Sequence, residues 1–439
     1  MKTLLRIPAC LLLIAIVWLS ALWAAAAEEL PTAIQDYAAR PDPAFSWRIQ
    51  NKQSRAQDQV WEVELVSQNW HGMVWKHSLL IFHPRELRHP EHVLLFITGG
   101  STGQKLREDN VRLGLRLATL AKARVAMLHH VPNQPLLDGR KEDDLITETW
   151  LRYLDSGDVT WILQLPMAKS AVRAMDAVEA IAKAEWKGSV RGFVVTGASK
   201  RGWTTWLSAV ADPRVKAIAP MVIDMLNLRP QMRYQLDTWG AYSEQIEDYT
   251  RKGLIKEGEL TDREALLLRL VDPYTYRSQL TLPKLLIHGT NDPYWPVDAA
   301  KLYWNDLVGP KSLLEVANGN HGLKGGQDLA VATLAAFFRH VAGQSPWPTL
   351  QWKHGDAEGG FVLEIQSSPK PKAARLWVAH SLTKDVRQSE WASQPLADHG
   401  GGFLAKVPKP EQGHVAFFGE LQFETDGLPF SLCTLVRRE

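Results

Sequence analysis

The chain has 439 residues, of which 45% are hydrophobic and 22% charged, and its formal net charge is +2 at pH 7. This length exceeds that of one ordinary domain, so we expect two or three folded units with a sizeable core. The close balance of 50 basic and 48 acidic residues argues against a protein that binds nucleic acid or another polyanion.

The first 27 residues are predicted to be a secretory signal peptide. Lys2 and Arg6 precede an apolar run that ends in small residues, and this pattern indicates cleavage before Glu28. The alternative is an uncleaved anchor, because the apolar run is nearly long enough to span a bilayer. We expect a periplasmic or secreted bacterial protein, with no stable membrane insertion after cleavage.

The cysteines and histidines predict neither a disulfide nor a metal site. Cys10 and Cys433 are the only cysteines, and removal of the signal leaves one of them. The histidines His71, His77, His129 and His130 lie in apolar or loop sequence without metal-ligand spacing, which favours structural roles. No cofactor is expected.

Beyond the signal, the elements predict an α/β protein with a doubly wound, mostly parallel sheet of the α/β-hydrolase type. Residues 60–66 and 74–82 alternate like an antiparallel hairpin. The continuous apolar runs at 93–98, 125–128, 193–196, 217–223, 284–288 and 313–316 are typical of central strands, and helical stretches separate most of them.

The stretch from Phe193 to Val210 predicts a nucleophile elbow. A buried strand leads into Gly197-Ala198-Ser199, and a helix follows at Lys200. This arrangement lifts the Ser199 hydroxyl above the sheet edge and aims a helix N-terminus at it. The usual pattern is G-x-S-x-G, but Arg201 takes the fifth position here and Gly202 comes one residue later. The structural alternative is a plain strand-helix unit in which the serine caps the helix.

Two further segments predict how the rest of the chain is organised. The polar stretch at about 225–282 is too long for a simple crossover, and we interpret it as a helical cap inserted over the strand ends within a hydrolase domain of residues 28–343. Trp239 and Trp295 are expected to line the pocket beneath it. Residues 344–439 carry short β-rich runs and predict a small accessory β-sandwich of immunoglobulin-like type.

A serine nucleophile needs a base and an orienting acid, which α/β-hydrolases supply in the order serine, acid, histidine. Asp292 follows the strand at 284–288, and His321 lies in a loop after the strand at 313–316. The sequence therefore predicts the triad Ser199–Asp292–His321. Asp224, which ends the preceding strand, is the alternative acid, and Asp298 is a weaker one.

The predicted oxyanion hole combines the N–H of Lys200 with an N–H from the loop Gly99-Gly100-Ser101. Glycines let the backbone approach a substrate closely. The Lys200 side chain either adds positive charge to the site or is solvated, and the sequence leaves that choice open.

The chain resembles the PhoPQ-activated pathogenicity-related proteins of Gram-negative bacteria, a virulence-associated family. The resemblance spans nearly all of the chain after the signal and rests on these motifs: residues 67–70 (SQNW), 129–135 (HHVPNQP), 142–144 (EDD), 165–169 (LPMAK), 196–203 (TGASKRGW), 289–292 (GTND) and 377–379 (WVA). It implies an exported α/β-hydrolase-like protein with a β-rich C-terminal part, and no defined substrate. The elbow is also similar to the G-C-S-R-x-G elbow of glucuronoyl esterases, where the basic residue after the serine aids oxyanion stabilisation.

The leading function is that of an exported serine hydrolase that cleaves an acyl ester or amide of a small-molecule or peptide substrate. The alternatives are a serine peptidase and a non-catalytic binding or signalling protein on a hydrolase scaffold, because a fold does not imply a function. The substrate, the partner of the C-terminal part and the oligomeric state are not specified by the sequence.

Overall fold

The computed structural model describes residues 29–104 and 107–439, and within this part residues 33–439 form one compact unit. The predicted signal peptide lies outside the described residues. No helix in the described ranges is long and apolar enough to cross a membrane.

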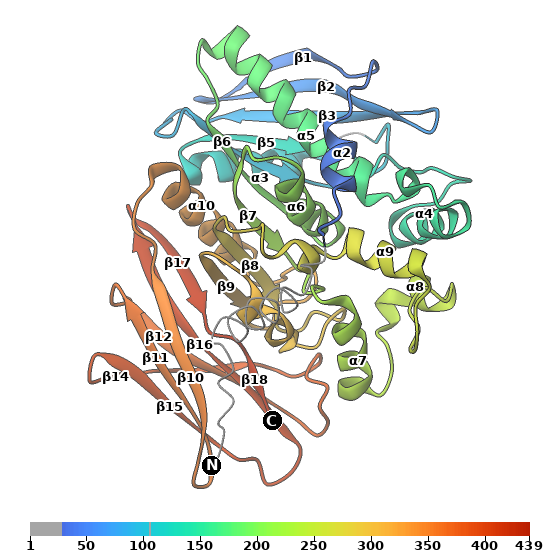
Figure 1. The fold of residues 1–439 in the computed structure, drawn as a ribbon. Helices are drawn as coiled ribbons and strands as arrows, with labels where there is room; N and C mark the ends of the chain where they lie inside the picture. The colour runs from blue at the N-terminus through green and yellow to red at the C-terminus, as the bar shows by residue number, and fades with distance from the viewer. Residues whose placement is uncertain (1–28, 105–106) are drawn as a thin grey trace, which may run out of the picture. The chain divides into compact units, whose positions relative to one another are not determined.

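The centre of the unit is a nine-stranded sheet in the order β1-β2-β3-β5-β4-β6-β7-β8-β9 (Figure 1). The chain runs antiparallel from β1 to β2, β3 and β5, and parallel through all later pairs. The strands are β1 (Ser46–Arg55), β2 (Asp58–Trp70), β3 (Met73–His83), β4 (His92–Ile97), β5 (Arg124–Leu128), β6 (Gly192–Ala198), β7 (Val215–Met221), β8 (Lys284–Gly289) and β9 (Lys311–Val316).

This sheet confirms the α/β-hydrolase fold predicted from the sequence, including the hairpin β2–β3 and the apolar parallel strands. Residues in β6 and β8 are buried almost throughout, as expected for strands covered on both faces, whereas β2 alternates between buried and exposed positions. Strand β1 was not predicted, because most of its residues are polar and exposed.

Helices cover both faces of the sheet. Helices α2 (Ala33–Ala39), α5 (Gln164–Ile181) and α6 (Lys200–Ala211) pack together on one face, and α3 (Glu108–Ala121) and α10 (Gln327–Gly343) pack together on the other. Helix α4 (Glu142–Ser156) follows the loop after β5 and contacts the helices of the insertion described next. Helices α3, α4 and α5 lie in the stretches between strands where the sequence predicts helices.

The chain between β7 and β8 forms a helical insertion near the C-terminal ends of the strands. It contains α7 (Leu228–Trp239), α8 (Glu247–Arg251) and α9 (Asp262–Val271), with short 3-10 turns at Glu244–Ile246 and Pro273–Tyr276. Helix α9 begins with a capping box in which Thr261 and Glu264 satisfy each other's backbone N–H groups, which fixes its start.

After α10 the chain forms antiparallel β-sheets that pack face to face. One has the order β10-β11-β15-β14, and the other has β13-β12-β16-β17 with β18 paired to β16. Gly419 of β16 lies against Ile365 of β11, which joins the two sheets. The strands are β10 (Thr349–Ala357), β11 (Gly360–Ser368), β12 (Ala373–Ser381), β13 (Ala392–Pro395), β14 (Asp398–His399), β15 (Gly402–Pro408), β16 (His414–Thr425), β17 (Leu428–Cys433) and β18 (Arg437–Arg438).

The sandwich shares its core with the hydrolase part. One buried apolar cluster runs from Leu314 on β9 through Phe337 and Phe338 on α10 to Phe430 and Leu432 on β17. Because α10 and β9 both contact β17, the C-terminal sheets are packed directly on the hydrolase sheet.

Candidate active site

Ser199 occupies the turn between β6 and α6, at the carboxyl edge of the sheet. Its backbone has φ 57° and ψ −126°, a left-handed conformation that costs energy in a residue other than glycine. The Ser199 N–H donates to the carbonyl of Met221 at 2.9 Å, and the Ser199 carbonyl accepts from Trp203 N–H at 3.0 Å. These bonds hold the serine in a strained strand-turn-helix geometry, which is the geometry predicted for a nucleophile elbow.

The departure from G-x-S-x-G has a packing explanation. A Cβ on Gly197 would lie 2.7 Å from the Arg201 carbonyl oxygen, and one on Gly202 would lie 2.6 Å from Ile223 Cγ2 and 3.0 Å from the Met221 carbonyl oxygen. Gly202 therefore provides the close approach of α6 to the strands, and the fifth position of the motif is free to carry a large side chain.

Arg201 points into the protein. Its Nε donates to the carbonyl of Val131 at 2.5 Å, and its two terminal nitrogens each donate to Glu142 at 2.7 Å. The guanidinium fills the space beside Gly99, where a Cβ would lie 2.4 Å from Nη2. Burial alone would raise the pKa of Glu142, but the hydrogen bonds and positive charge of Arg201 outweigh it and lower that pKa to about 2.

Asp292 and His321 are in direct contact. Asp292 follows β8 and His321 follows β9, and Asp292 Oδ2 lies 2.8 Å from His321 Nδ1. The other carboxylate oxygen accepts the Tyr294 N–H at 2.9 Å, so Asp292 is held in one orientation. The Tyr294 ring packs on the His321 ring at 4.2 Å between centroids, which fixes the plane of the imidazole.

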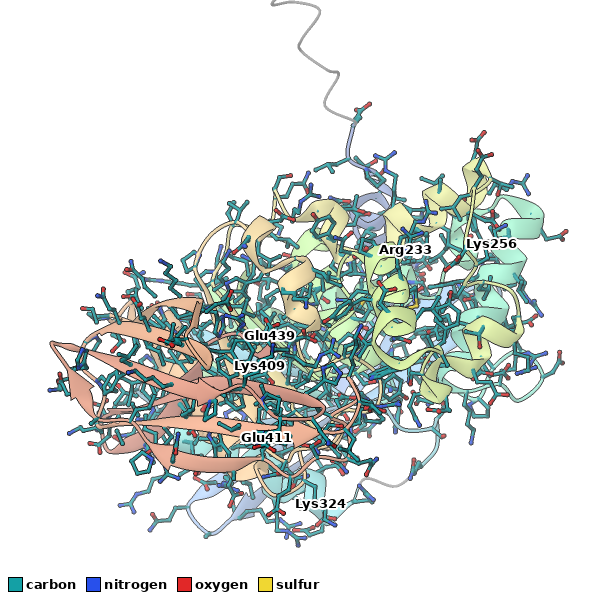
Figure 2. The ribbon with its side chains drawn as sticks, turned by 90° about the horizontal axis from the view of Figure 1, so that it is seen from below. Arg233, Lys256, Lys324, Lys409, Glu411 and Glu439 are labelled. Atoms are coloured by element: carbon teal, nitrogen blue, oxygen red, sulfur yellow. The ribbon has the colours of Figure 1, made fainter. Side chains whose placement is uncertain are left out.

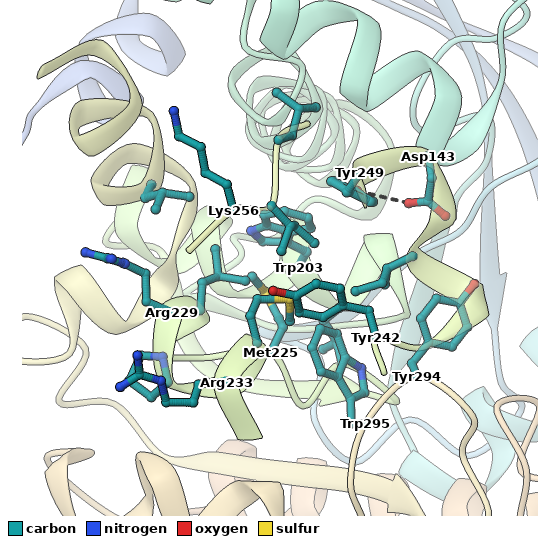
Figure 3. A pocket seen from close by; sticks show the side chains of 18 of the residues that line it. Asp143, Trp203, Met225, Arg229, Arg233, Tyr242, Tyr249, Lys256, Tyr294 and Trp295 are labelled. Carbon is teal, nitrogen blue, oxygen red and sulfur yellow. Dashed lines mark hydrogen bonds between the residues drawn. The ribbon is translucent and has the colours of Figure 1, made fainter. Parts of the chain in front are cut away.

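A cavity of about 510 Å³ lies above these residues, and Ser199, Lys200 and His321 all line it. Most of its wall comes from the insertion between β7 and β8 (Figure 3). Within the described ranges the Ser199 hydroxyl makes no hydrogen bond to a side chain, including that of His321. Catalytic hydrogen bonds are often long in unliganded enzymes and tighten with substrate.

The Lys200 side chain is neither solvated nor free in the cavity. Its ammonium lies 2.8 Å from Asp143 Oδ2 and 3.5 Å from Glu142 Oε2. The Tyr249 hydroxyl donates to the second oxygen of Asp143 at 3.0 Å. Both oxygens of Asp143 are therefore occupied, and the positive charge of Lys200 is balanced by carboxylates.

The two alternative acids lie elsewhere. Asp224 accepts a hydrogen bond from Tyr303 at 2.6 Å and lies 3.9 Å from His288, while Asp298 is bound by Tyr234, Lys301 and Arg438. Neither carboxylate contacts His321. The structure thus brings Asp292, and not Asp224 or Asp298, to the candidate base.

Gly99 and Gly100 lie next to the elbow but are not among the residues that line the cavity. The Gly99 carbonyl accepts the His130 N–H at 3.0 Å, and Gly100 has φ +105°, a conformation that favours glycine. The Ser101 N–H donates to the Gln104 side chain at 3.2 Å. The N–H of Lys200 opens α6, where no preceding turn supplies a carbonyl for it.

The expectation for the tryptophans was half right. Trp295 lines the cavity, as does Trp203, whereas Trp239 does not and instead packs beneath the Arg387 guanidinium at 4.0 Å. Trp239 is the last residue of α7 and its ring packs against Arg387 of the C-terminal part.

Sequence reasoning missed most polar residues of the cavity wall, among them Asp143, Tyr249 and Tyr294 near the candidate base and Arg229 and Arg233 on the insertion. The signal for Asp143 was present in the acidic run at 142–144, which α4 carries at its first turn beside the elbow. Tyr249 and Tyr294 had no such signal, since single tyrosines in a helical insertion and a loop are common.

No group of three or more histidine, cysteine, aspartate or glutamate side chains in residues 29–104 and 107–439 is arranged to hold a metal ion.

The profile of the PhoPQ-activated pathogenicity-related proteins matches residues 34–387. The chain belongs to this family. It is also 30% identical over 428 residues to autocrine proliferation repressor protein A of Dictyostelium discoideum, covering 89% of this chain and 86% of that protein.

Several solved esterase structures are similar to this member of the family at low identity. Acetyl xylan esterase 1 from Thermoanaerobacterium sp. JW/SL YS485 matches with 15% identity and a TM-score of 0.47, over 70% of this chain and 94% of that chain. The acetyl xylan esterase from Paenibacillus sp. R4 matches with 14% identity and a TM-score of 0.48, over 69% of this chain and 92% of that chain.

Proposed function

We propose that this protein is a serine hydrolase that cleaves an acyl ester or amide, with Ser199 as nucleophile, His321 as base and Asp292 as orienting acid. The observation that carries the proposal is the 2.8 Å contact of Asp292 with His321 at the wall of the cavity that Ser199 also lines. A strained serine at a helix N-terminus and a carboxylate-bound histidine are the parts that acyl transfer needs.

In the proposed reaction His321 Nε2 accepts the proton of Ser199 Oγ as the oxygen attacks the acyl carbonyl. Asp292 holds the imidazole by Nδ1 and stabilises its charged form. The developing oxyanion is bound by the Lys200 N–H and by an N–H of Gly99 or Gly100. His321 then gives the proton to the leaving group, and a water molecule repeats the sequence to release the acid and regenerate Ser199.

The Lys200 side chain has an indirect role in this proposal. Because its ammonium is bound to Asp143, it steadies the first turn of α6 and the wall of the cavity. The backbone N–H, and not the side-chain charge, is the group that faces the oxyanion.

Reaction with a fluorophosphonate probe tests the proposal. The wild-type protein is expected to gain one covalent adduct, located on Ser199 by peptide mass spectrometry. Ser199→Ala and His321→Ala are expected to lose it, with circular dichroism confirming that both remain folded. A folded wild-type protein that is not labelled, even by small probes, would overturn the proposal.

A non-catalytic signalling protein is the second candidate, and one observation favours it. The similar Dictyostelium protein is named as a proliferation repressor, and that name describes a biological effect rather than a reaction. If this candidate is correct, Ser199→Ala keeps the biological effect of the wild-type protein. A serine peptidase is a form of the first candidate, and activity on short peptide amides but not on esters of similar shape would indicate it.

We also propose export from the cytoplasm through a signal in residues 1–27. The N-terminal sequence of the protein recovered outside the cytoplasm tests this, and an N-terminus at Glu28 is the expected result.

A further inference from the structure

The cavity beside Ser199 is far larger than a small acyl group requires. Its volume is about 510 Å³, within the range of pockets that enclose drug-sized ligands. The wall is mainly apolar, with contributions from the elbow helix, from the segment after β7 and from the insertion; its larger members include Trp150, Trp203, Met225, Met232, Leu254 and Trp295. A bulky hydrocarbon group would gain the most by burial here.

The charges at the reacting end of the cavity are already neutralised within the protein. Asp143 is bound by Lys200 and by Tyr249, so it offers no free carboxylate to a substrate. Tyr294 lies on the same side of the cavity as Asp143 and packs on His321 (Figure 3). Burial and the nearby charges of Asp143 and Asp292 raise the pKa of Tyr294 to about 12, so its hydroxyl stays neutral.

The opposite side of the cavity carries exposed cations. Figure 3 shows Arg229, Arg233 and Lys256 on the side away from Asp143 and Tyr294. In Figure 2, Arg233 and Lys256 both lie over the helices of the insertion, at its surface. The cavity is therefore polarised, with the candidate nucleophile and base at one end and positive side chains at the other.

Two of these cations have no carboxylate partner among residues 29–104 and 107–439. Arg229 donates to the carbonyl of Gly258 at 2.8 Å, which leaves its charge unbalanced, and Arg233 forms no ion pair. Lys256 is bound to Glu264 at 2.7 Å. Glu257 is an exposed acid on the same wall. Because the charge of Lys256 is balanced by Glu264, the cationic character of this side of the cavity rests on the guanidinium groups of Arg229 and Arg233.

We propose that the substrate is an elongated amphipathic acyl ester whose hydrocarbon chain ends in a carboxylate. The scissile carbonyl lies at Ser199, the chain runs along the apolar wall, and the terminal carboxylate is bound by Arg229 and Arg233. Guanidinium groups bind carboxylates through paired hydrogen bonds, which a single ammonium does not provide. The reacting end of this inference rests on the proposed function, whereas the binding of the chain and its carboxylate does not.

Matched ester pairs test the inference. The 4-nitrophenyl monoester of octanedioic acid is compared with 4-nitrophenyl octanoate and acetate, at low and high salt. Hydrolysis by the wild-type protein is expected to be fastest for the octanedioate ester, with a kcat/KM about five- to tenfold above octanoate at low salt and a smaller ratio at high salt. Faster turnover of acetate than of octanoate would overturn the inference.

The double variant Arg229→Gln/Arg233→Gln identifies the carboxylate site. It is expected to lower the ratio of kcat/KM for octanedioate over octanoate to about one. The control Lys406→Gln/Lys409→Gln removes two exposed cations of the C-terminal sheets and should leave the ratio as in the wild type. An unchanged ratio in the Arg229/Arg233 variant would overturn the inference.

Calorimetric binding separates failure of this inference from failure of the proposed function. Octanoate and the uncharged 1-octanol are titrated into Ser199→Ala, which cannot form an acyl-enzyme. Tighter binding of octanoate, lost when Arg229→Gln/Arg233→Gln is added, supports the inference even if the wild type resists the fluorophosphonate. A wild type that is labelled while neither ligand binds Ser199→Ala keeps the proposed function and overturns the inference.

Discussion

Asp292 Oδ2 and His321 Nδ1 lie 2.8 Å apart, although 29 positions separate the two residues along the chain. The contact forms because β8 and β9 are adjacent parallel strands, so the loops after them meet at one edge of the sheet. Tyr294 closes this arrangement from one side through its N–H and its ring.

The contact predicts the effect of replacing the acid. Asp292→Asn keeps the shape but removes the charge that stabilises the imidazolium, so kcat for an ester substrate is expected to fall by about 10³- to 10⁴-fold. Asp224→Asn is the matched control, because Asp224 is bound to Tyr303 and not to His321. An Asp292→Asn loss below tenfold, or an equal loss in the control, would contradict the assignment of the acid.

The ion pair of Glu142 with Arg201 predicts a dependence of stability on acid pH. Because the folded protein lowers the Glu142 pKa from 4.5 to about 2, its contribution is present above pH 4.5 and is lost as the pH falls toward 2. Glu142→Gln should lower the melting temperature at pH 7 and flatten this part of its pH profile. Glu358→Gln, at an exposed position on the turn after β10, serves as the control. Identical acid profiles for Glu142→Gln and the wild type would exclude a role for this ion pair.

The buried side chain of His288 predicts a second dependence of folding stability on pH, on the alkaline side. Burial alone lowers its pKa, but the charges of Asp224 and Glu315 raise it to about 9. A folded-state pKa above the unfolded value of 6.5 means that the charged imidazole stabilises the fold below pH 6.5, and that this contribution is lost as the pH rises toward 9. His288→Gln is expected to cost about 3–5 kcal/mol at pH 6.5, because two buried carboxylates lose their cation.

The measurement for His288→Gln is urea unfolding between pH 6 and pH 9. The difference in unfolding free energy from the wild type should shrink as the pH rises. His380→Gln, which changes an exposed histidine on β12, should show no such difference. A pH-independent loss in His288→Gln would indicate a packing effect instead of a charge effect.

The close packing of the elbow helix predicts that Gly202 tolerates no side chain. Gly202→Ala places a Cβ 2.6 Å from Ile223 Cγ2 and 3.0 Å from two carbonyl oxygens, so α6 must shift. The expected loss of stability is about 1–3 kcal/mol, and fluorophosphonate labelling should fall as Ser199 moves with the helix. In Gly188→Ala the nearest neighbour of the new Cβ is 3.8 Å away, and a change of less than about 0.5 kcal/mol is expected in thermal unfolding.

Arg438 predicts a coupling between the C-terminal sheets and the insertion. From β18 it contacts Asp298 at 3.2 Å and donates to the Tyr234 hydroxyl of α7 at 2.5 Å. Since Asp298 keeps Lys301 as a partner, Arg438→Met is expected to cost about 2–3 kcal/mol. Arg375→Met, at an exposed site of β12, is the control for thermal unfolding, and equal melting temperatures of the two variants would refute the coupling.

The pattern of residues along the chain determined much of this protein's fold. Apolar runs predicted the parallel strands because strands covered on both faces need apolar side chains at consecutive positions. The sequence Gly197-Ala198-Ser199 after such a run predicted the elbow, since few residues accept that turn. Asp292 and His321 could be predicted as neighbours because both follow strands of one parallel sheet.

Other features depended on contacts between distant parts of the chain, and only the tertiary structure decided them. The motif around the elbow left the direction of the Arg201 side chain open, and the side chain turns inward because Glu142, 59 positions earlier, meets it there. Trp239 was expected in the cavity but packs under Arg387 of the C-terminal part. A local pattern specifies which face of an element is apolar, whereas the partner of a single polar or aromatic side chain is set by how the elements pack against one another.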